Sequence, residues 1–486
     1  MFRRNDKMEN GLHKKYGLVT AICMVVGIVI GSGVFFKAQT ILQKTEGNMS
    51  LGIMAWLIGG AIMLCCISAF AIMATKYEKV NGIVDYAEAT VGSKYGYVVG
   101  WFMALIYYPS LVSVLAWLSA RYTLVFLTTA FPSITLAIPA SEGGCVVGPE
   151  CMALSVFMLC AASAMNALSP KLAGRFQVGT TVIKMIPLLL LAVVGTVVGL
   201  FGENGTLVEN ISSTGFSDTP NGNLLFGAVV ATAFAYEGWI IATSINAELK
   251  DSKKNLPIAL ITGGIIIVAI YLFYFIGVAG GADVQTLMND GATTAFINIF
   301  GGTFGNILNL FVAISCMGTL NGLMLACTRG LYAVAARGEG PKPEMFGQID
   351  KETNMPNNAA IFGLLLSAFW FFFFYGSNLA PFPWFGVFGF DSSELAIITV
   401  YALYIPIFIN FMKKADDLSF GKRYVAPALG LVGSIFMVFA ALYAHGIQPY
   451  QAAAAEGRFA CPVLFYLIIF AVVIVLGIVL NKKNRK

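Results

Sequence analysis

The sequence predicts an all-α, polytopic membrane protein with about twelve transmembrane helices. Of its 486 residues, 58% are hydrophobic and only 11% are charged, whereas soluble domains carry about 25% charged and roughly 45–50% apolar residues. A soluble fold must present its surface to water, so this composition requires lipid as the solvent for most of the surface. Apolar runs of about 20 residues, each long enough to cross a ~30 Å hydrocarbon core as a helix, recur along the chain.

These runs define twelve candidate spans, of which the fourth and the eighth fit the pattern least well. They are 17–43, 48–75, 96–129, 152–168, 174–201, 223–247, 256–281, 293–335, 358–375, 392–412, 424–446 and 460–480. An even number of spans places both termini on the same side of the membrane.

Basic residues indicate which side that is. With the N-terminus inside, 24 of the 30 lysines and arginines fall in the tails and in the loops on the same side. Because cytoplasmic loops retain positive charge, we predict a multi-pass protein of the cell membrane whose tails, 1–16 and 481–486, are cytoplasmic. The basic tails are then topological signals near lipid headgroups, and no nucleic-acid partner is expected.

Cysteine and histidine positions do not indicate a metal or cofactor site. The nine cysteines lack metal-ligand spacing, and the two histidines, His13 and His445, are remote in sequence. We therefore expect no zinc, no haem and no other cofactor. Cys145 and Cys151 share an outward loop, where a disulfide and two free thiols are both open alternatives.

The first span contains an unusual cluster, Gly31-Ser32-Gly33. Glycine costs about 1 kcal/mol in a helix interior, and serine competes for backbone hydrogen bonds. Two interpretations are open: the helix unwinds at this point, or the small residues let two helices pack closely.

The sixth span contains a second interruption, because an acid and a glycine, Glu237 and Gly238, lie in mid-span among aromatic residues. A buried acid costs at least ~2.5 kcal/mol. Spans one and six each begin a five-helix half, 17–201 and 223–412, and 424–480 adds two further helices. Because five is odd, the second half enters the bilayer inverted. Paired interruptions in inverted repeats indicate a central binding site in transporters.

Interrupted helices expose the groups that would bind a zwitterion. The freed amides at the start of the second half-helix favour an anion, and the freed carbonyls at the end of the first half-helix attract a cation. An α-amino acid carries an adjacent carboxylate and ammonium group, so it is the ligand class that best matches such a break.

Four motifs resemble those of the amino acid–polyamine–organocation superfamily, and most closely its L-type amino acid transporter branch and bacterial relatives. They are the glycine motif 27–36, the segment 234–239, the loop 248–257 and the segment 329–356. The resemblance implies a LeuT-like core of five plus five inverted helices with broken helices 1 and 6, two extra C-terminal helices, and alternating access.

The resemblance also implies individual roles. The amides of Ser32 and Gly33 would hold the substrate carboxylate, and the carbonyls of Val29 and Phe234 would hold its ammonium group. The Phe234 ring is similar in position to the aromatic residue that covers the substrate from outside. The full predicted substrate site comprises Val29, Gly31, Ser32, Gly33, Phe234, Ala235 and Glu237.

Lys184 lies inside the apolar fifth span. A buried ammonium group must find acceptors or lose its proton, and snorkelling to the interface is the alternative. In sodium-independent relatives a fifth-helix lysine takes the place of a sodium ion, so the resemblance implies that Lys184 braces broken span one.

Glu237 departs from the small residue often present at its position in the L-type branch. Three alternatives are open for it: it accepts a proton, it favours a cationic substrate side chain, or it pairs with an interior hydroxyl group. The third alternative is structural, and the other two concern transport.

Together these features predict a sodium-independent secondary transporter of amino acids, with small or medium neutral L-amino acids favoured. It would work by exchange or by proton-coupled uptake, as an antiporter or a symporter, since no phosphate-binding loop indicates use of ATP. A polyamine or cationic amino acid transporter is the alternative. A membrane-embedded enzyme or a channel is disfavoured because neither a nucleophile–base pair nor filter repeats are present. Any partner subunit and the oligomeric state are left open.

Overall fold

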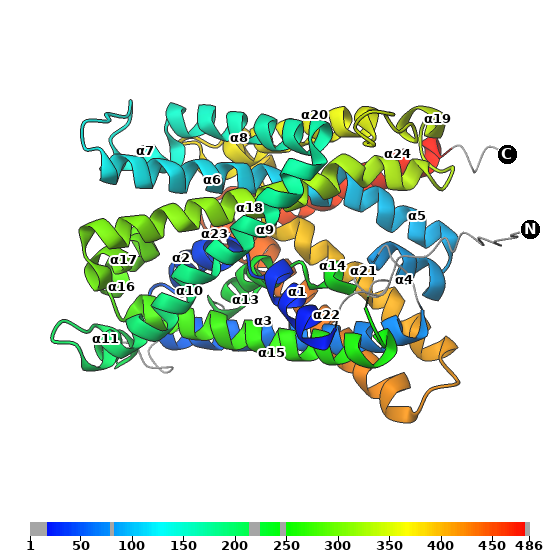
Figure 1. The fold of residues 1–486 in the computed structure, drawn as a ribbon, viewed down its shortest axis with the longest axis horizontal. Coiled ribbons are helices and arrows are strands. Elements are labelled where there is room, and N and C mark those ends of the chain that lie inside the picture. The colour runs from blue at the N-terminus through cyan, green and yellow to red at the C-terminus, as the bar shows by residue number, and fades with distance from the viewer. Residues whose placement is uncertain (1–16, 78–81, 213–223, 244–248, 482–486) are drawn as a thin grey trace, which may run out of the picture.

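The structure is a computed structural model that describes residues 17–77, 82–212, 224–243 and 249–481. The regular structure of these residues is helical, and the long helices run side by side along one direction (Figure 1). Eleven helices are long and apolar enough to cross a membrane, and one bent pair makes a twelfth. The predicted fold class is therefore confirmed. The predicted tails, 1–16 and 481–486, lie outside the described residues except for Asn481, and Glu248 also lies outside them.

Most of the first six spans consist of more than one helical segment. Their bounds are α1 (Leu18–Val29) with α2 (Gly33–Lys44); α3 (Met49–Lys76); α5 (Ser93–Phe102), η1 (Met103–Tyr107) and α6 (Tyr108–Ala130); α7 (Gly144–Val147) and α8 (Pro149–Leu168); α9 (Pro170–Ile183), α10 (Met185–Leu190), η3 (Leu191–Gly195) and α11 (Thr196–Phe201); and α13 (Leu224–Tyr236) with α14 (Trp239–Ala242).

The last six spans and the short helices between spans complete the bundle. The spans are α15 (Ser252–Ala279); α18 (Gly302–Ala335); α20 (Asn357–Phe374) with η5 (Tyr375–Leu379); η6 (Gly386–Phe388) with α21 (Ser392–Lys414); η7 (Gly421–Val425), α22 (Ala426–Leu442), η8 (Tyr443–Ile447) and α23 (Gln448–Ala455); and α24 (Pro462–Leu480). Outside them lie α4 (Ile83–Thr90), η2 (Ala140–Glu142), α12 (Leu207–Ser212), α16 (Val284–Asp290), α17 (Ala292–Phe300) and α19 (Pro343–Phe346).

The eighth span differs from its predicted extent. We predicted one span over 293–335, but the chain turns at Gly301, whose φ is +81°. A positive φ is readily adopted by glycine and rarely by other residues. The segment is therefore a short helix, α17, followed by the true span, α18.

The helix ends gather on two opposite faces of the bundle (Figure 1). On one face, the Arg337 guanidinium pairs with Asp85 and Glu88 of α4, and the Gly340 amide donates to Asn481 at the end of α24. In Figure 1, α4, α19 and the end of α24 lie on the right, whereas α7, α11, α16 and α17 lie on the left. The first face is the one on which the basic loops were predicted.

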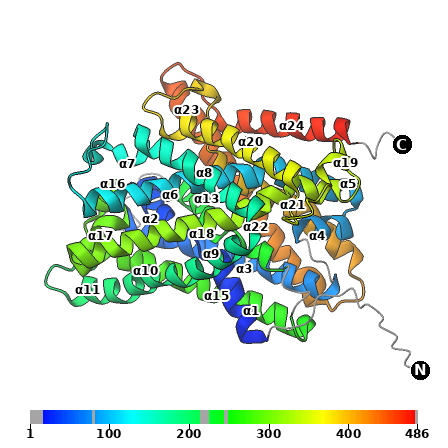
Figure 2. The same cartoon turned by 45° about the horizontal axis from the view of Figure 1, so that its top comes forward.

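Small residues allow close contact between spans five and seven. A Cβ atom on Gly195 would lie 2.5 Å from the Gly277 carbonyl oxygen, and one on Gly277 would lie 2.0 Å from the Leu191 carbonyl oxygen. Here the two backbones approach so closely that only glycine fits, which is how helices in lipid gain packing energy. Figure 2 shows that α1 lies beside α15, the helix of span seven.

Candidate substrate site

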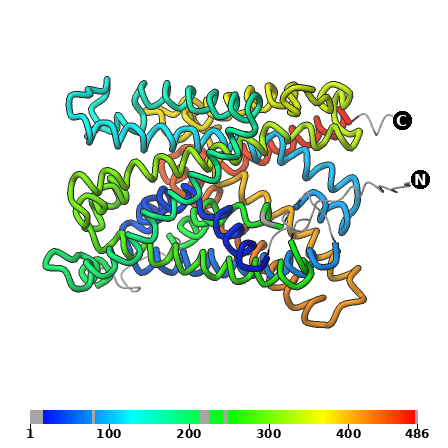
Figure 3. The backbone as a smooth tube through the Cα atoms, in the orientation of Figure 1, coloured from blue at the N-terminus to red at the C-terminus, as the bar shows by residue number. Residues whose placement is uncertain are grey.

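The first span is broken where the glycine cluster lies. Helix α1 ends at Val29 and α2 begins at Gly33, and the two axes differ by 49°. The change in direction can be followed in Figure 3. As at any helix start, the amides of the first turn of α2 lack acceptors within their own helix. The unwinding interpretation of this cluster therefore describes the structure.

The sixth span is interrupted as well, but more mildly. Helix α13 ends at Tyr236 and α14 begins at Trp239, with Gly238 between them at a φ of +103°. That backbone conformation favours glycine. The two pieces still form one span-length segment, so this break bends the chain less than the first one does.

The two breaks touch each other. A Cβ atom on Gly33 would lie 2.8 Å from Ala235 Cα, and one on Gly31 would lie 3.0 Å from Thr319 Oγ1. A larger residue at Gly33 would push against backbone, which cannot move aside as a flexible side chain can. The close-packing interpretation therefore also describes the structure, and the same glycines serve both purposes.

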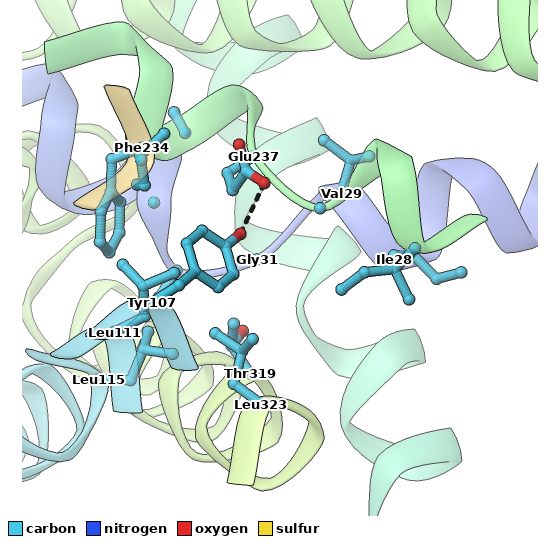
Figure 4. Close-up of a pocket in the computed structure, with 16 residues that line it drawn as sticks. Ile28, Val29, Gly31, Tyr107, Leu111, Leu115, Phe234, Glu237, Thr319 and Leu323 are labelled. Atoms are coloured by element: carbon cyan, nitrogen blue, oxygen red, sulfur yellow. Dashed lines mark hydrogen bonds between the residues drawn. The ribbon is translucent and has the colours of Figure 1, made fainter. Parts of the chain in front are cut away.

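A pocket lies at this junction (Figure 4). All seven predicted substrate-site residues line it, namely Val29, Gly31, Ser32, Gly33, Phe234, Ala235 and Glu237. The structure thus brings together residues separated by about two hundred positions in the sequence.

The rest of the pocket wall comes mainly from spans three and eight. Span three contributes a tyrosine and two leucines, and span eight contributes a threonine and a leucine: Tyr107, Leu111, Leu115, Thr319 and Leu323. The wall is thus mostly apolar, and its polar groups are concentrated at the two helix breaks. Neither Tyr107 nor Thr319 is among the site residues predicted from the sequence.

Lys184 lies behind the break in span one. Its side chain is buried, and its Nζ atom donates a 2.6 Å hydrogen bond to the Gly27 carbonyl oxygen. The Tyr271 hydroxyl donates to the Val29 carbonyl oxygen at 3.2 Å. The last carbonyls of a helix need such partners, so Lys184 and Tyr271 each cap one at the end of α1. The snorkelling alternative for Lys184 does not fit its burial.

Glu237 points into the pocket and accepts a hydrogen bond from the Tyr107 hydroxyl, at 2.6 Å from Oε1 (Figure 4). The pairing with an interior hydroxyl, one of the three alternatives for this acid, is thus present. It does not decide between the two alternatives that concern transport, because the same contact is compatible with both.

A buried charge cluster lies beside the pocket, and sequence reasoning missed it. Lys37 Nζ of α2 lies 2.5 Å from Glu394 Oε1 of α21, and His445 Nε2 of η8 lies 3.1 Å from Glu394 Oε2. The Lys37 and Glu394 side chains are each only 1% exposed. A charged residue inside an apolar run was the signal that identified Glu237, and the same signal at Glu394 would have found this cluster.

The aromatic ring of Phe234 connects the cluster to the pocket. Lys37 Nζ lies 5.2 Å from the centre of the Phe234 ring, and the Phe36 ring packs edge-on against Phe234 at 6.4 Å. Phe234 therefore lies between the pocket and the charge cluster, which agrees in position with an aromatic cover.

The two cysteines that were predicted to share a loop lie in helices instead, Cys145 in α7 and Cys151 in α8, and both are buried. Both Cys145 and Cys151 are free thiols in the structure, which is the second of the two alternatives. Within the described residues, no group of three or more histidine, cysteine or acidic side chains is arranged to hold a metal ion.

A bundle of membrane spans with a pocket between two interrupted helices defines a membrane carrier. Residues 16–474 match the amino acid permease family, so the chain belongs to that family. It is 27% identical over 442 residues to the serine/threonine exchanger SteT of Bacillus subtilis (strain 168). The matched region covers 88% of this chain and 91% of SteT.

Mammalian relatives match a shorter part of the chain. The Asc-type amino acid transporter 1 of Mus musculus is 27% identical over 68% of this chain and 60% of its own length. The large neutral amino acids transporter small subunit 2 of Homo sapiens is 28% identical over 72% of this chain and 63% of its own length. The chain thus spans less than two thirds of these two relatives.

Proposed function

We propose that this protein is a sodium-independent secondary transporter that carries small or medium neutral L-amino acids across the cell membrane. The observation that carries the proposal is the pocket at which the interruptions of the first and the sixth spans meet. The names of the relatives support neutral amino acids but not one size, since one relative is a serine/threonine exchanger and another is a transporter of large neutral amino acids.

The helix ends bind the part of the substrate that all amino acids share. The amides of Ser32 and Gly33, at the start of α2, hold the carboxylate, where the positive end of the helix dipole favours an anion. The carbonyls of Val29 and Phe234 hold the ammonium group. Because main-chain groups recognise the amino acid backbone, the apolar walls around Leu111 are left to select the side chain.

Lys184 replaces a coupling sodium ion. Its ammonium group supplies a positive charge to the carbonyl end of α1, where it bonds the Gly27 oxygen. A metal cation at the same place would need the same carbonyls, so the lysine makes sodium unnecessary. The hydrogen bond is also a tether that holds α1 to the fifth span.

Alternating access follows from the architecture. The halves 17–201 and 223–412 are the inverted repeats, and the helices of 424–480 lie outside this core. Few basic residues were predicted on the side where Lys37 pairs with Glu394, so we assign that side to the exterior and both termini to the cytoplasm. Exchange and proton-coupled uptake are both compatible with this cycle.

A carrier of polyamines is the competing function. A polyamine has several positive charges and no carboxylate, so its site needs several acids and no anion-binding helix start. The pocket lining contains one acid, Glu237. The single acid and the paired helix ends favour an amino acid.

Counterflow in proteoliposomes tests the proposal. Proteoliposomes that contain only this purified chain are loaded with unlabelled substrate, and the twenty amino acids are screened. The vesicles should accumulate the labelled amino acid transiently, and to the same extent in sodium and in choline buffers. Saturation with a neutral amino acid is expected. A requirement for sodium, or linear uptake without exchange as in a channel, would contradict it.

A further inference from the structure

Within the part of the chain that the structure describes, Glu237 has no positively charged partner. The Tyr107 hydroxyl and the Gly238 amide donate to its carboxylate, and both donors are neutral. Among the described residues no lysine, arginine or histidine forms an ion pair with it. Lys184 bonds the Gly27 carbonyl, and Lys37 is paired with Glu394.

The other ionisable groups facing Glu237 are also neutral near pH 7. These groups belong to three of the spans that surround Glu237. They are Tyr107 and Tyr108 of span three, Cys66 of α3, and Tyr401 and Tyr404 of α21. Tyrosine and cysteine side chains ionise only at higher pH. Helices α1 and α18 contribute only non-ionisable residues to this part of the pocket wall.

A zwitterionic substrate does not supply the missing charge. Its ammonium and carboxylate groups cancel each other and are both engaged by the broken helix ends. An ionised Glu237 would then leave one net negative charge in a buried pocket, and an uncompensated buried charge is strongly disfavoured. The loaded pocket therefore needs one more positive charge.

We propose that the loaded pocket always holds one positive charge opposite Glu237, supplied either by a proton or by a cationic substrate side chain. The inference rests on the proposed function and deepens it. A neutral amino acid crosses with one proton bound to Glu237, and a cationic amino acid crosses with Glu237 ionised and without a proton. Each loaded carrier thus moves the same net charge.

The hydrogen bond from Tyr107 suits both loaded states. A tyrosine hydroxyl can donate to an ionised carboxylate and equally to the carbonyl oxygen of a protonated one. Figure 4 shows the Tyr107 ring below the carboxylate, with its hydroxyl group pointing towards it. The carboxylate is therefore held in place whichever ligand supplies the charge.

Proton counting during exchange tests the proposal. Proteoliposomes that contain the whole chain and a lumenal pH dye are loaded with lysine and placed in the best neutral substrate of the counterflow screen. Each neutral molecule that enters for one lysine should bring one proton, so the lumen acidifies. The reversed gradient should alkalinise the lumen, and neutral-for-neutral exchange should leave its pH unchanged.

Variants at Glu237 separate its role from a general effect of mutation. In Glu237→Gln, the proton movement should disappear and the ratio of lysine to neutral transport should fall about tenfold or more, because one charge-assisted contact is lost. Glu237→Asp should restore part of that ratio. Glu352→Gln, an exposed acid in a loop, is the matched control and should keep the wild-type stoichiometry.

The wild-type stoichiometry decides the outcome even if the variants fold poorly. Counterflow of neutral amino acids without exchange of lysine would overturn the inference while leaving the proposed function intact. Exchange of lysine for a neutral amino acid without any change in lumenal pH would do the same. Absence of counterflow with every amino acid would overturn both.

Discussion

The buried pair of Lys37 and Glu394 allows a quantitative test by a double-mutant cycle. Both side chains are 1% exposed, and the two charged atoms are 2.5 Å apart. Removing one partner of such a pair leaves an uncompensated buried charge, which costs about 3–5 kcal/mol, whereas replacing both partners by neutral groups is often nearly neutral. The pair therefore predicts strongly non-additive effects.

The structure sets the size of each effect. In Lys37→Met, Glu394 keeps His445 at 3.1 Å, so we expect the lower end of the range, about 3 kcal/mol. In Glu394→Gln, Lys37 keeps its cation–π contacts with the rings of Phe36 and Phe234, each of which contributes at most about 2 kcal/mol. We therefore expect a loss of stability similar to that of Lys37→Met. The double variant should recover most of the loss, with a coupling energy of about 3 kcal/mol or more.

The stabilities of the variants are ranked by thermal unfolding in detergent, with size-exclusion chromatography as the readout. Both single variants should unfold well below the wild type, and Lys37→Met/Glu394→Gln should unfold close to it. The matched control is the exposed pair of Arg458 and Glu456, whose removal should not shift the midpoint measurably, because exposed ion pairs contribute little. A double variant as unstable as the sum of the singles would refute the reasoning.

Three further predictions concern the helix breaks. Lys184→Met removes the bond to the Gly27 carbonyl, so amino acid counterflow should fall about tenfold or more, as expected for a lost charge-assisted bond; normal counterflow would exclude the bracing role. Gly33→Ala places a Cβ atom 2.8 Å from Ala235 Cα, so substrate affinity measured by thermal-shift titration should be lost while the protein still elutes as a folded monodisperse peak. Gly238→Ala forces an L side chain to a φ of +103°, so the melting midpoint should fall, at a cost of about 1–2 kcal/mol; an unchanged midpoint would show that the turn relaxes freely.

Local backbone chemistry explains why the helix breaks could be predicted from the sequence. A glycine cluster weakens a helix wherever it occurs, so the interruptions near Gly31 and Gly238 could be read from single segments. The apolar runs likewise placed all twelve spans, since length and hydropathy are local properties. Only the turn at Gly301 was missed, because the apolar pattern continues across it.

Pairing across the fold explains what could not be predicted. Lys37 and Glu394 are 357 positions apart, and a single sequence gives no indication of which helices will be neighbours. The same holds for the contact of Tyr107 with Glu237, since the sequence drew attention to Glu237 but not to its partner. The bond from Lys184 to span one was anticipated through the family resemblance rather than through the residues themselves.

The two pieces of span one are anchored to different parts of the molecule. Helix α2 is held by Lys37 to Glu394 and by Gln39 to the carbonyls of Met288 and Asn289. Helix α1 is bonded instead by Lys184 and Tyr271. An amino acid bound to the ends of both pieces would therefore link these two parts of the molecule. Substrate binding would then be coupled directly to the movement of one part relative to the other.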